Sequence, residues 1–444
     1  LGVCAKTEHN EAAPAQHELA CVYNTANIAA DHNQLVMDVM QKAAKRHGLV
    51  CLLHEKPFAG VNGSGKHNNW SMATDTGINV FDPGETPGEN AQFLLFLCAV
   101  IKAADDYQDV LRVSVARAGN DHRLGAAEAP PAIISMFLGD ELTEILAAIE
   151  SDTPVGQKEK TLFKVGVHAL PPFPKDTTDR NRTSPFAYTG AKFEFRMPGS
   201  SASISSCNIA LNTSVAEELR QFADELEEAE DFNAALHALI RRVVHEHSRV
   251  IFNGNGYDPG WVEEAARRGL HNLKSTPEAL PHITDRANVE LFTRHGVFSI
   301  SELRARQEVF QEEYCKLVTI EGKTALTMAR REILPAVSGF IRSLAESAQA
   351  QRAIMPERRP RYECSTLSYL TQLMDAAYSL CGELEDALVA AEGIKDLTDK
   401  SFHLHDKVLP VMGALRAACD DMETVTADDA WPIPTYGELL YGVK

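Results

Sequence analysis

The spacing of apolar residues predicts short strands and helices in the first half of the chain. Residues 1–25 contain short strand-like pieces interrupted at Pro14. Continuous or alternating apolar runs predict further strands at Leu49–Leu53, Val110–Val115, Thr161–Val167 and Lys192–Met197. Apolar residues three and four positions apart predict helices at His32–Arg46 and Asn90–Tyr107. This mixture indicates an α/β or α+β domain that extends to about residue 215.

The remainder of the chain has a helical pattern. Helical spacing predicts helices at Val215–Glu230, Asn233–Ser248, Ser301–Ala350, Ser365–Ala391 and Lys400–Asp420. Pro335 predicts a break or kink, because proline cannot donate the backbone hydrogen bond that a helix interior needs. A basic, proline-containing linker, residues 352–361, separates two of these helices. The last third is therefore expected to be a helical extension.

Composition and charge narrow the class of protein. The 444 residues include 44% hydrophobic and 24% charged residues, as in a globular protein that is large enough for two domains. The chain contains no run of 18 or more apolar residues, so no transmembrane helix is predicted. The net charge of −19 argues against nucleic acid or an anionic membrane as a partner. The nine cysteines include no C-x-x-C pair, so we expect buried, reduced thiols in a cytoplasmic protein.

The stretch Lys56–Ser71 carries the most specific chemical pattern, K-P-x-x-x-x-N-G-S-G-x-H-x-x-x-S. The glycines of Asn62–Gly65 let the backbone turn and let a ligand approach closely. His67 follows this loop, where its imidazole is a candidate metal ligand. A glycine-rich loop alone is a weak signal, and a single histidine is more often a core residue, so the whole string has to be considered together.

Two carboxylates near the start of the chain, Glu11 and Glu18, flank a turn of small residues. Hard divalent cations such as Mg²⁺ prefer oxygen ligands, which paired carboxylates supply. On one unbroken strand these positions point to opposite faces, so a bend near Pro14 is needed to bring them together. Alone, the segment also fits an acidic surface loop, and Glu8 has no assigned role.

The predicted strand Lys192–Met197 has a charged face. Strand alternation places Lys192, Glu194 and Arg196 on one face and two phenylalanines on the core face. An ordinary amphipathic strand would have the same pattern. Further charged residues occur in two loops, Arg123–Pro130 and Asp179–Ser184.

Together these segments resemble the motifs of glutamine synthetases, in the same order, over about residues 1–320. Lys56–Ser71 resembles the ATP- and metal-binding pattern, Glu11–Glu18 the E-x-x-x-x-Q-x-E segment, and Lys192–Pro198 the R-x-E-x-R-x-P strand. Arg123–Pro130 resembles the R-x-x-x-x-x-E-A-P flap and Asp179–Ser184 the R-N-R-S segment. The likeness is to the long type III enzymes, which carry a helical extension.

The resemblance implies roles for individual residues. The expected metal ligands, for two or more Mg²⁺ or Mn²⁺ ions, are Glu11, Glu18, His67 and Glu194. The expected glutamate-binding residues are Asn62, Gly63, Arg123 and Arg196. The expected ATP-binding residues are Asn69, Ser71, Arg182 and Lys192. Arg182 and Arg196 would also face the reacting phosphoryl group, and Glu128 would take a proton from ammonium.

Several positions depart from the family pattern. Lys192 replaces an arginine, so it keeps the charge but loses the bidentate fork. Ala187 stands where a further phosphate-binding arginine is common, and Asn69 stands where many relatives have a histidine. The segment between Arg123 and Glu128 is one residue shorter than in the family flap.

The resemblance also implies an architecture and a reaction. It implies an α+β catalytic domain, a curved antiparallel sheet or half-barrel with helices, over residues 1–275 or as far as about 320. A C-terminal helical domain then covers residues 276–444. The implied reaction joins ammonia to L-glutamate with ATP, through γ-glutamyl phosphate. The implied assembly is a homo-oligomer, a dodecamer of stacked hexamers, with active sites between subunits.

Two of the family's metal-binding glutamates and its N-terminal β-grasp domain lie upstream of the segment that Leu1 begins. We therefore expect an N-terminally incomplete chain that alone binds metal and nucleotide weakly and is inactive. Two other functions remain open. A ligase for another amine, such as a polyamine, is compatible with the small residues Gly125–Ala127, whereas the retained ligands argue against a non-catalytic scaffold.

Overall fold

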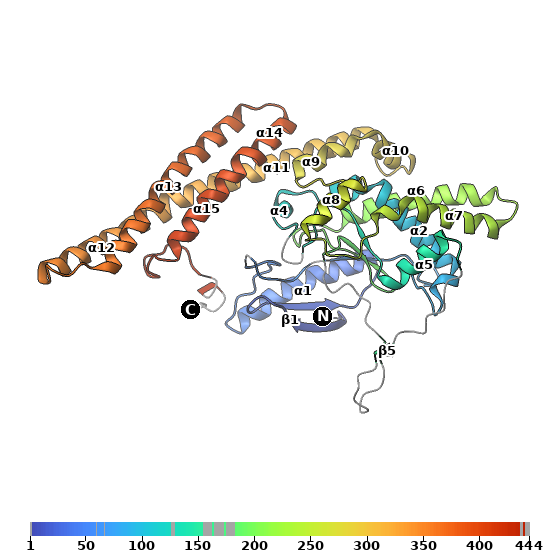
Figure 1. Cartoon of the computed structure of the whole chain (residues 1–444), viewed down its shortest axis with the longest axis horizontal. Coiled ribbons are helices and arrows are strands. Elements are labelled where there is room, and N and C mark those ends of the chain that lie inside the picture. Colours follow the sequence, from blue (N-terminus) through green and yellow to red (C-terminus); the bar gives the residue numbers. More distant parts are fainter. Residues whose placement is uncertain are drawn as a thin grey trace. The chain divides into compact units, whose positions relative to one another are not determined.

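The computed structural model describes residues 2–58, 60–65, 67–125, 129–153, 162–163, 173–174, 183–435 and 438–439 (Figure 1). The chain divides into two compact units. The first unit comprises Leu1–Ala30 and His54–Gln307, and the second comprises Asp31–Leu53 and Glu308–Lys444.

Short strands and helices alternate in the first part of the chain. The strands are β1 Ala5–Asn10, β2 His17–Cys21, β3 Asn68–Trp70, β4 Met136–Phe137, β5 Leu162–Phe163, β6 Phe173–Pro174, β7 Phe186–Tyr188 and β8 Phe193–Phe195. The helices are α1 Ala26–Arg46, α2 Ala91–Asp106, α3 Gln108–Val113, α4 Ala118–Asp121, α5 Asp140–Glu150, α6 Ser205–Glu227, α7 Phe232–His247, α8 Pro259–Arg267, α9 Thr276–Ala279 and α10 Arg286–Arg294. The later helices are α11 Ile300–Met328, α12 Leu334–Ile354, α13 Arg361–Gly393, α14 Leu397–His403 and α15 Leu409–Glu423.

The strands form small sheets, and none of those described is closed. β1 and β2 form an antiparallel hairpin, and β5 pairs with β6. The four-stranded sheet has the order β3-β8-β7-β4, in which β4 and β7 are parallel and the other pairs are antiparallel. The predicted α+β class is confirmed, although this sheet is mixed and not wholly antiparallel.

Aromatic residues fill the core beneath the four-stranded sheet. Phe193 and Phe195 of β8 are fully buried, and the ring of Phe193 lies 5.0 Å from that of Phe186 and 5.1 Å from that of Phe81. Trp70 of β3 completes the cluster, with its ring 5.4 Å from Phe81. Because alternate residues of β8 point inward, the residues between them lie on the opposite face. The predicted alternation is therefore confirmed, and it positions Glu194 away from the core.

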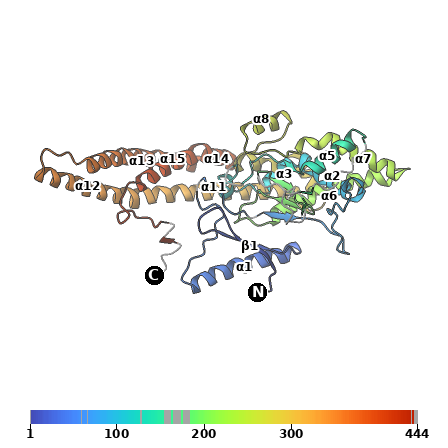
Figure 2. The same ribbon diagram turned by 60° about the horizontal axis from the view of Figure 1, so that its bottom comes forward.

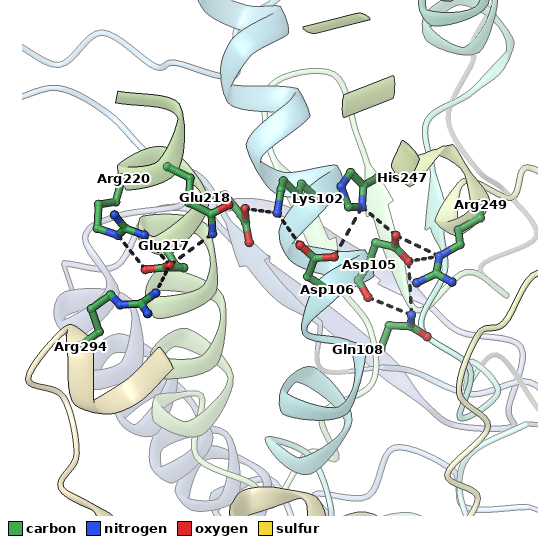
Figure 3. Close-up of polar contacts among 11 residues, drawn as sticks. Lys102, Asp105, Asp106, Gln108, Glu217, Glu218, Arg220, His247, Arg249 and Arg294 are labelled. Carbon is green, nitrogen blue, oxygen red and sulfur yellow. Dashed lines mark hydrogen bonds and ion pairs between the residues drawn. The ribbon is translucent and has the colours of Figure 1, made fainter. Parts of the chain in front are cut away.

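The helices of the first unit are joined by a buried charged network (Figure 3). In it, the Nζ of Lys102 in α2 lies 2.7 Å from a carboxylate oxygen of Glu218 in α6, and Lys102 also pairs with Asp106. Beside it, the Nδ1 of His247 in α7 lies 2.8 Å from Asp105. Pairing these groups reduces the cost of taking their charges out of water. The network therefore ties α2 to α6 and α7, which also pack on α2 through apolar side chains.

The second unit is dominated by long helices. Helix α13 packs along both α12 and α15, as both views show (Figures 1 and 2). A π-helical segment, Ala329–Ile333, lies between α11 and α12, directly before Pro335. The proline ring would clash with a carbonyl one turn earlier, and the wider π turn relieves that clash. The break predicted at Pro335 is thus confirmed as a local change of helix type.

Two predicted strands are wrong. Leu49–Leu53 lies in no strand or helix, and Leu49 and Leu53 remain 46% and 45% exposed. Val110–Val115 falls largely in helix α3. The side chain of Arg112 in this helix is buried, with Nε donating to the carbonyl of Leu273 at 2.7 Å. An apolar run cannot by itself distinguish a strand from a buried helical turn.

Most other predicted elements agree with the structure, including α1, α2, α6, α7, α13 and the last two helices. The predicted strand Thr161–Val167 lies outside the described residues except for Leu162–Phe163, which form β5. The nine cysteines are free thiols, and the predicted burial holds for five of them: Cys98, Cys207, Cys315, Cys381 and Cys419. Cys4 is exposed, and Cys21, Cys51 and Cys364 are half-buried. In the described part of the chain, no helix has the length and apolar character that crossing a membrane requires.

Candidate active site

The hairpin β1–β2 brings Glu11 and Glu18 together. The turn between the strands is closed by hydrogen bonds from the Glu11 amide to the Gln16 carbonyl, 3.0 Å, and from the Gln16 amide to the Ala13 carbonyl, 3.2 Å. Ala15 adopts a positive φ of 55°, which lets the chain reverse within this short turn. The bend expected near Pro14 is therefore present, and both glutamates point to the same side.

His9 completes a cluster with these two glutamates. Its Nε2 lies 3.1 Å from Oε1 of Glu11 and 3.1 Å from Oε2 of Glu18. His9 is the register partner of Glu18 across the hairpin, so both side chains emerge on one face. The sequence pattern alone predicted no role for His9. Strand alternation could have suggested one, since His9 stands two positions before Glu11.

The chemistry of this cluster fits a divalent cation. Its three ligand atoms all lie within 4.8 Å of one another. Burial, together with the neighbouring Glu11 carboxylate, raises the pKa of Glu18 above its ordinary value. Two negative charges held this close repel each other, and a bound cation would relieve that repulsion. Carboxylate oxygens are also the ligands that Mg²⁺ prefers.

The glycine-rich loop is fixed against the hairpin. The Ser64 hydroxyl donates to Oε1 of Glu18 at 3.2 Å, and the Ser64 amide donates to Oε1 of Gln16 at 3.1 Å. The Gln16 amide group in turn donates to the carbonyls of His54 and Glu55, at 3.0 and 3.1 Å. Gln16 therefore links the carboxylate cluster to both ends of the segment that contains the loop.

Gly63 is required by close packing within this loop. A Cβ at this position would lie 2.3 Å from the carbonyl oxygen of Glu55, a distance that real Cβ atoms do not reach. The atom in its way belongs to the backbone, so it cannot move aside as a flexible side chain would. Glycine is therefore dictated here by the approach of two backbone segments.

Strand β8 presents Glu194 among positive charges. One oxygen of Glu194 lies 3.2 Å from Nζ of Lys192, and the other accepts from Nε of Arg196 at 3.2 Å. The Nδ1 of His67 lies 3.8 Å from the same carboxylate. Burial raises the pKa of Glu194, but the three neighbouring charges outweigh it, so the pKa lies below its ordinary value. The predicted metal ligands His67 and Glu194 therefore lie close together, and the Glu194 carboxylate is ionised.

Two of the predicted ATP-binding residues, Asn69 and Lys192, lie beside Glu194 at this pair of strands. Asn69 of β3 is the register partner of Glu194, and Lys192 donates to the Asn69 side-chain oxygen. Asn62, Asn69 and Ser71 are exposed. Ala187, in the neighbouring strand β7, is fully buried in the core. Two predicted catalytic residues, Glu128 and Arg182, lie outside the described residues.

Arg123 is held in a buried polar setting. Its Nε donates to Oδ1 of Asn120 at 2.9 Å, and its Nη2 donates to the carbonyl of Met197 at 2.6 Å. Nε also lies 3.4 Å from Oε1 of Glu55. Burial lowers the pKa of Arg123, and the Glu55 charge opposes that effect. Asn120 lies in helix α4, three residues before Arg123. Glu55 was not predicted as a site residue, because it is distant from Arg123 in the sequence.

A separate apolar hollow of about 370 Å³ lies between α2, α6 and the start of α7. Its lining includes Leu95, Phe222 and Phe232, and Glu227 is its one charged residue. None of the predicted site residues lines it. This hollow is therefore not part of the candidate active site.

Comparison with known families gives two matches. The family model described as "Glutamine synthetase, catalytic domain" matches residues 1–116, and the one described as "Glutamine synthetase C-terminal domain" matches residues 235–352. These matches cover the hairpin, the glycine-rich loop and β3 at one end, and helices α8–α11 at the other.

Curated proteins match nearly the whole chain. The chain is 44% identical to a "Type-3 glutamine synthetase" from Dictyostelium discoideum, over 99% of the chain and 61% of that protein. It is 42% identical to a "Glutamine synthetase" from Butyrivibrio fibrisolvens and 40% identical to one from Bacteroides fragilis, covering 63% and 62% of them. The chain thus spans about three fifths of the length of these curated relatives.

Proposed function

The chain belongs to the glutamine synthetase family, and on that premise we propose that the full-length protein joins ammonia to L-glutamate at the expense of ATP. The products would be L-glutamine, ADP and phosphate. The observation that carries the proposal is the contact between the Glu11–Glu18 carboxylate pair and Ser64 of the glycine-rich loop. This contact brings together in space two motifs that lie far apart in the sequence.

The proposed reaction has two steps. The γ-phosphoryl group of ATP moves to the side-chain carboxylate of glutamate, which releases ADP and forms γ-glutamyl phosphate. Ammonia then attacks the acyl carbon and phosphate leaves. Bound Mg²⁺ or Mn²⁺ ions, two or more per site, would shield the negative charge of the phosphoryl group. Positive charge from Arg196 and Arg182 would add to that shielding.

The residues of the chain divide among these tasks. Glu11, Glu18 and the neighbouring His9 would hold one cation, and His67 with Glu194 would hold a second. Arg123, together with Asn62 and Gly63, would bind glutamate, because a guanidinium suits a carboxylate. Asn69, Ser71 and Lys192 would contact ATP. Glu128 would accept a proton from ammonium, which must be deprotonated before it can act as a nucleophile.

The proposal extends to the architecture of the protein. The catalytic domain would cover residues 1–275, or extend to about 320, and build the curved sheet or half-barrel of the family. The helical residues 276–444 would form the type III extension. The full-length protein would be a cytoplasmic homo-oligomer, a dodecamer of stacked hexamers, with glutamate, ammonium and ATP as its substrates.

Phosphate release by the full-length protein tests the function. The assay contains ATP, Mg²⁺ and glutamate, with and without ammonia, and is repeated with Glu128→Ala. Ammonia-dependent release that the substitution abolishes is the expected result. Release that requires a polyamine or another amine would assign a different ligase. No release from a well-folded oligomer would indicate a non-catalytic scaffold.

A further inference from the structure

Glu55 lies immediately before the motif that begins at Lys56, and no site role follows from its position in the sequence. Its side chain is only 12% exposed. Oε1 accepts a hydrogen bond from the Ser200 amide at 3.1 Å and lies 3.4 Å from Nε of Arg123. Oε2 is buried and makes no hydrogen bond to the described residues. Burying a charged carboxylate costs free energy unless a group of opposite charge lies beside it. Arg123 is the positive group beside Glu55.

Three groups hold the Arg123 guanidinium from one side. Asn120 accepts from Nε, Met197 accepts from Nη2, and Glu55 supplies the neighbouring negative charge. Nη1 and the second hydrogen of Nη2 make no hydrogen bond to the described residues. A guanidinium offers five N–H donors in a fixed planar fork, so contacts on one side determine where its other donors point.

The backbone of Glu55 belongs to the same assembly. Its carbonyl accepts from the Gln16 side chain at 3.1 Å and lies against Gly63 of the loop. Through Gln16 and Ser64, this peptide is connected to the Glu11–Glu18 cluster. Glu55 therefore contacts Arg123 with its side chain and the glycine-rich loop with its main chain.

We propose that Glu55 is a positioning residue for Arg123 and thereby sets the affinity for the carboxylate of the amino-acid substrate. This inference rests on the proposed function, in which Arg123 binds the α-carboxylate of glutamate. Glu55 holds the rotation of the guanidinium and balances its charge within a buried setting. Its loss lets the guanidinium turn toward other acceptors, so the bidentate contact with substrate is weakened.

The test measures KM for glutamate and for ATP in the full-length protein and in Glu55→Ala and Glu55→Gln. We expect Glu55→Ala to raise KM for glutamate about tenfold, while KM for ATP stays within about twofold. Glutamine keeps an oxygen that can accept from Ser200 and Arg123, so Glu55→Gln should give a smaller rise. Glu225→Ala is the matched control, because it removes a glutamate from a surface pair with Arg242 in the same unit.

The outcomes separate this inference from the function on which it rests. If the unsubstituted protein shows no ammonia-dependent turnover, the proposed function fails. If that protein is active and Glu55→Ala leaves KM for glutamate unchanged, the positioning role is wrong. A parallel rise in KM for glutamate and for ATP would also overturn it, because general damage to the fold would affect both substrates.

Discussion

Glu217 and Glu218 are adjacent in α6, yet their carboxylates lie in opposite electrostatic environments (Figure 3). Glu217 is surrounded by Arg220, Arg294 and His295, the last at 2.8 Å. Burial raises the pKa of Glu217, but hydrogen bonds from Arg220 and His295 outweigh it and bring the pKa to about 2. For Glu218, burial dominates over its pairing with Lys102 and raises the pKa to about 7.

The raised pKa of Glu218 predicts a pH-dependent stability. Between pH 4.5, the ordinary value, and about 7, folded Glu218 keeps a proton that the unfolded chain releases. The free energy of unfolding contributed by this group therefore falls as the pH rises through that window, by up to about 3 kcal/mol. Urea denaturation between pH 5 and 7 should show a flatter dependence on pH for Glu218→Gln than for the unsubstituted protein.

Glu217→Gln is the control for this experiment. The pKa of Glu217 in the unsubstituted protein is lowered by folding. Its carboxylate therefore contributes stability that is fully present above pH 4.5, the ordinary pKa of the group, and is lost only as the pH falls toward about 2. The substitution should therefore lower the free energy of unfolding by a similar amount at pH 5 and at pH 7. Equal slopes for the unsubstituted protein and Glu218→Gln would show that Glu218 does not titrate in this window.

His9 is predicted to contribute to divalent-cation binding. Its imidazole bridges Glu11 and Glu18, so it either binds the ion or fixes the carboxylates that do. We expect His9→Ala to weaken Mn²⁺ binding about tenfold, in the range typical when a group that orients metal ligands is lost. Glu8→Ala removes a carboxylate from the same strand but outside the cluster, and should leave binding unchanged. Equal affinities for the protein and His9→Ala in a Mn²⁺ titration would contradict the prediction.

Local patterns predicted the parts of the site that lie within one element. Alternation along Lys192–Met197 correctly placed Glu194 and Arg196 on the face away from Phe193, because strand geometry fixes that relation within a few residues. The bend at Pro14 could be expected for a similar reason, since two separated glutamates on one strand need a turn to meet. Helical spacing likewise predicted α2, whose apolar residues are buried.

Contacts between distant segments could not be predicted in this way. Glu55 meets Arg123 only after folding, and nothing in the spacing of the two residues indicates that contact. Arg112 lies in a segment that was predicted as a strand, but in the structure it is buried in helix α3 and forms an ion pair with Asp121 at 3.1 Å. An ion pair between two separate helices does not follow from the local sequence pattern.

Gly63→Ala is predicted to damage the glycine-rich loop. The new methyl group would meet the Glu55 carbonyl at 2.3 Å, and separating the two segments would strain the contacts of Gln16 with both. Overpacking of this kind typically costs about 1–3 kcal/mol. We expect a lower melting temperature together with reduced ammonia-dependent phosphate release.

Gly339→Ala provides a matched comparison for the Gly63 experiment. Gly339 lies inside helix α12, and a Cβ there meets no atom within 4 Å. Alanine is the better helix former, so this substitution should stabilise the protein by about 0.5–1 kcal/mol. If Gly63→Ala melts at or above the temperature of the unsubstituted protein, the close approach of Gly63 to Glu55 does not constrain the loop.

Lys192 is predicted to contact ATP in addition to its ion pair with Glu194. Its ammonium group contacts Glu194 at 3.2 Å and donates to Asn69, so it lies between a proposed metal ligand and a proposed nucleotide-binding residue. Lys192→Met should raise KM for ATP about tenfold, because it removes a charge-assisted contact worth about 1.5–3 kcal/mol. Lys192→Arg keeps the charge and should stay within about threefold of the unsubstituted protein. A methionine variant with unchanged KM for ATP but altered Mn²⁺ binding would instead assign Lys192 to Glu194 alone.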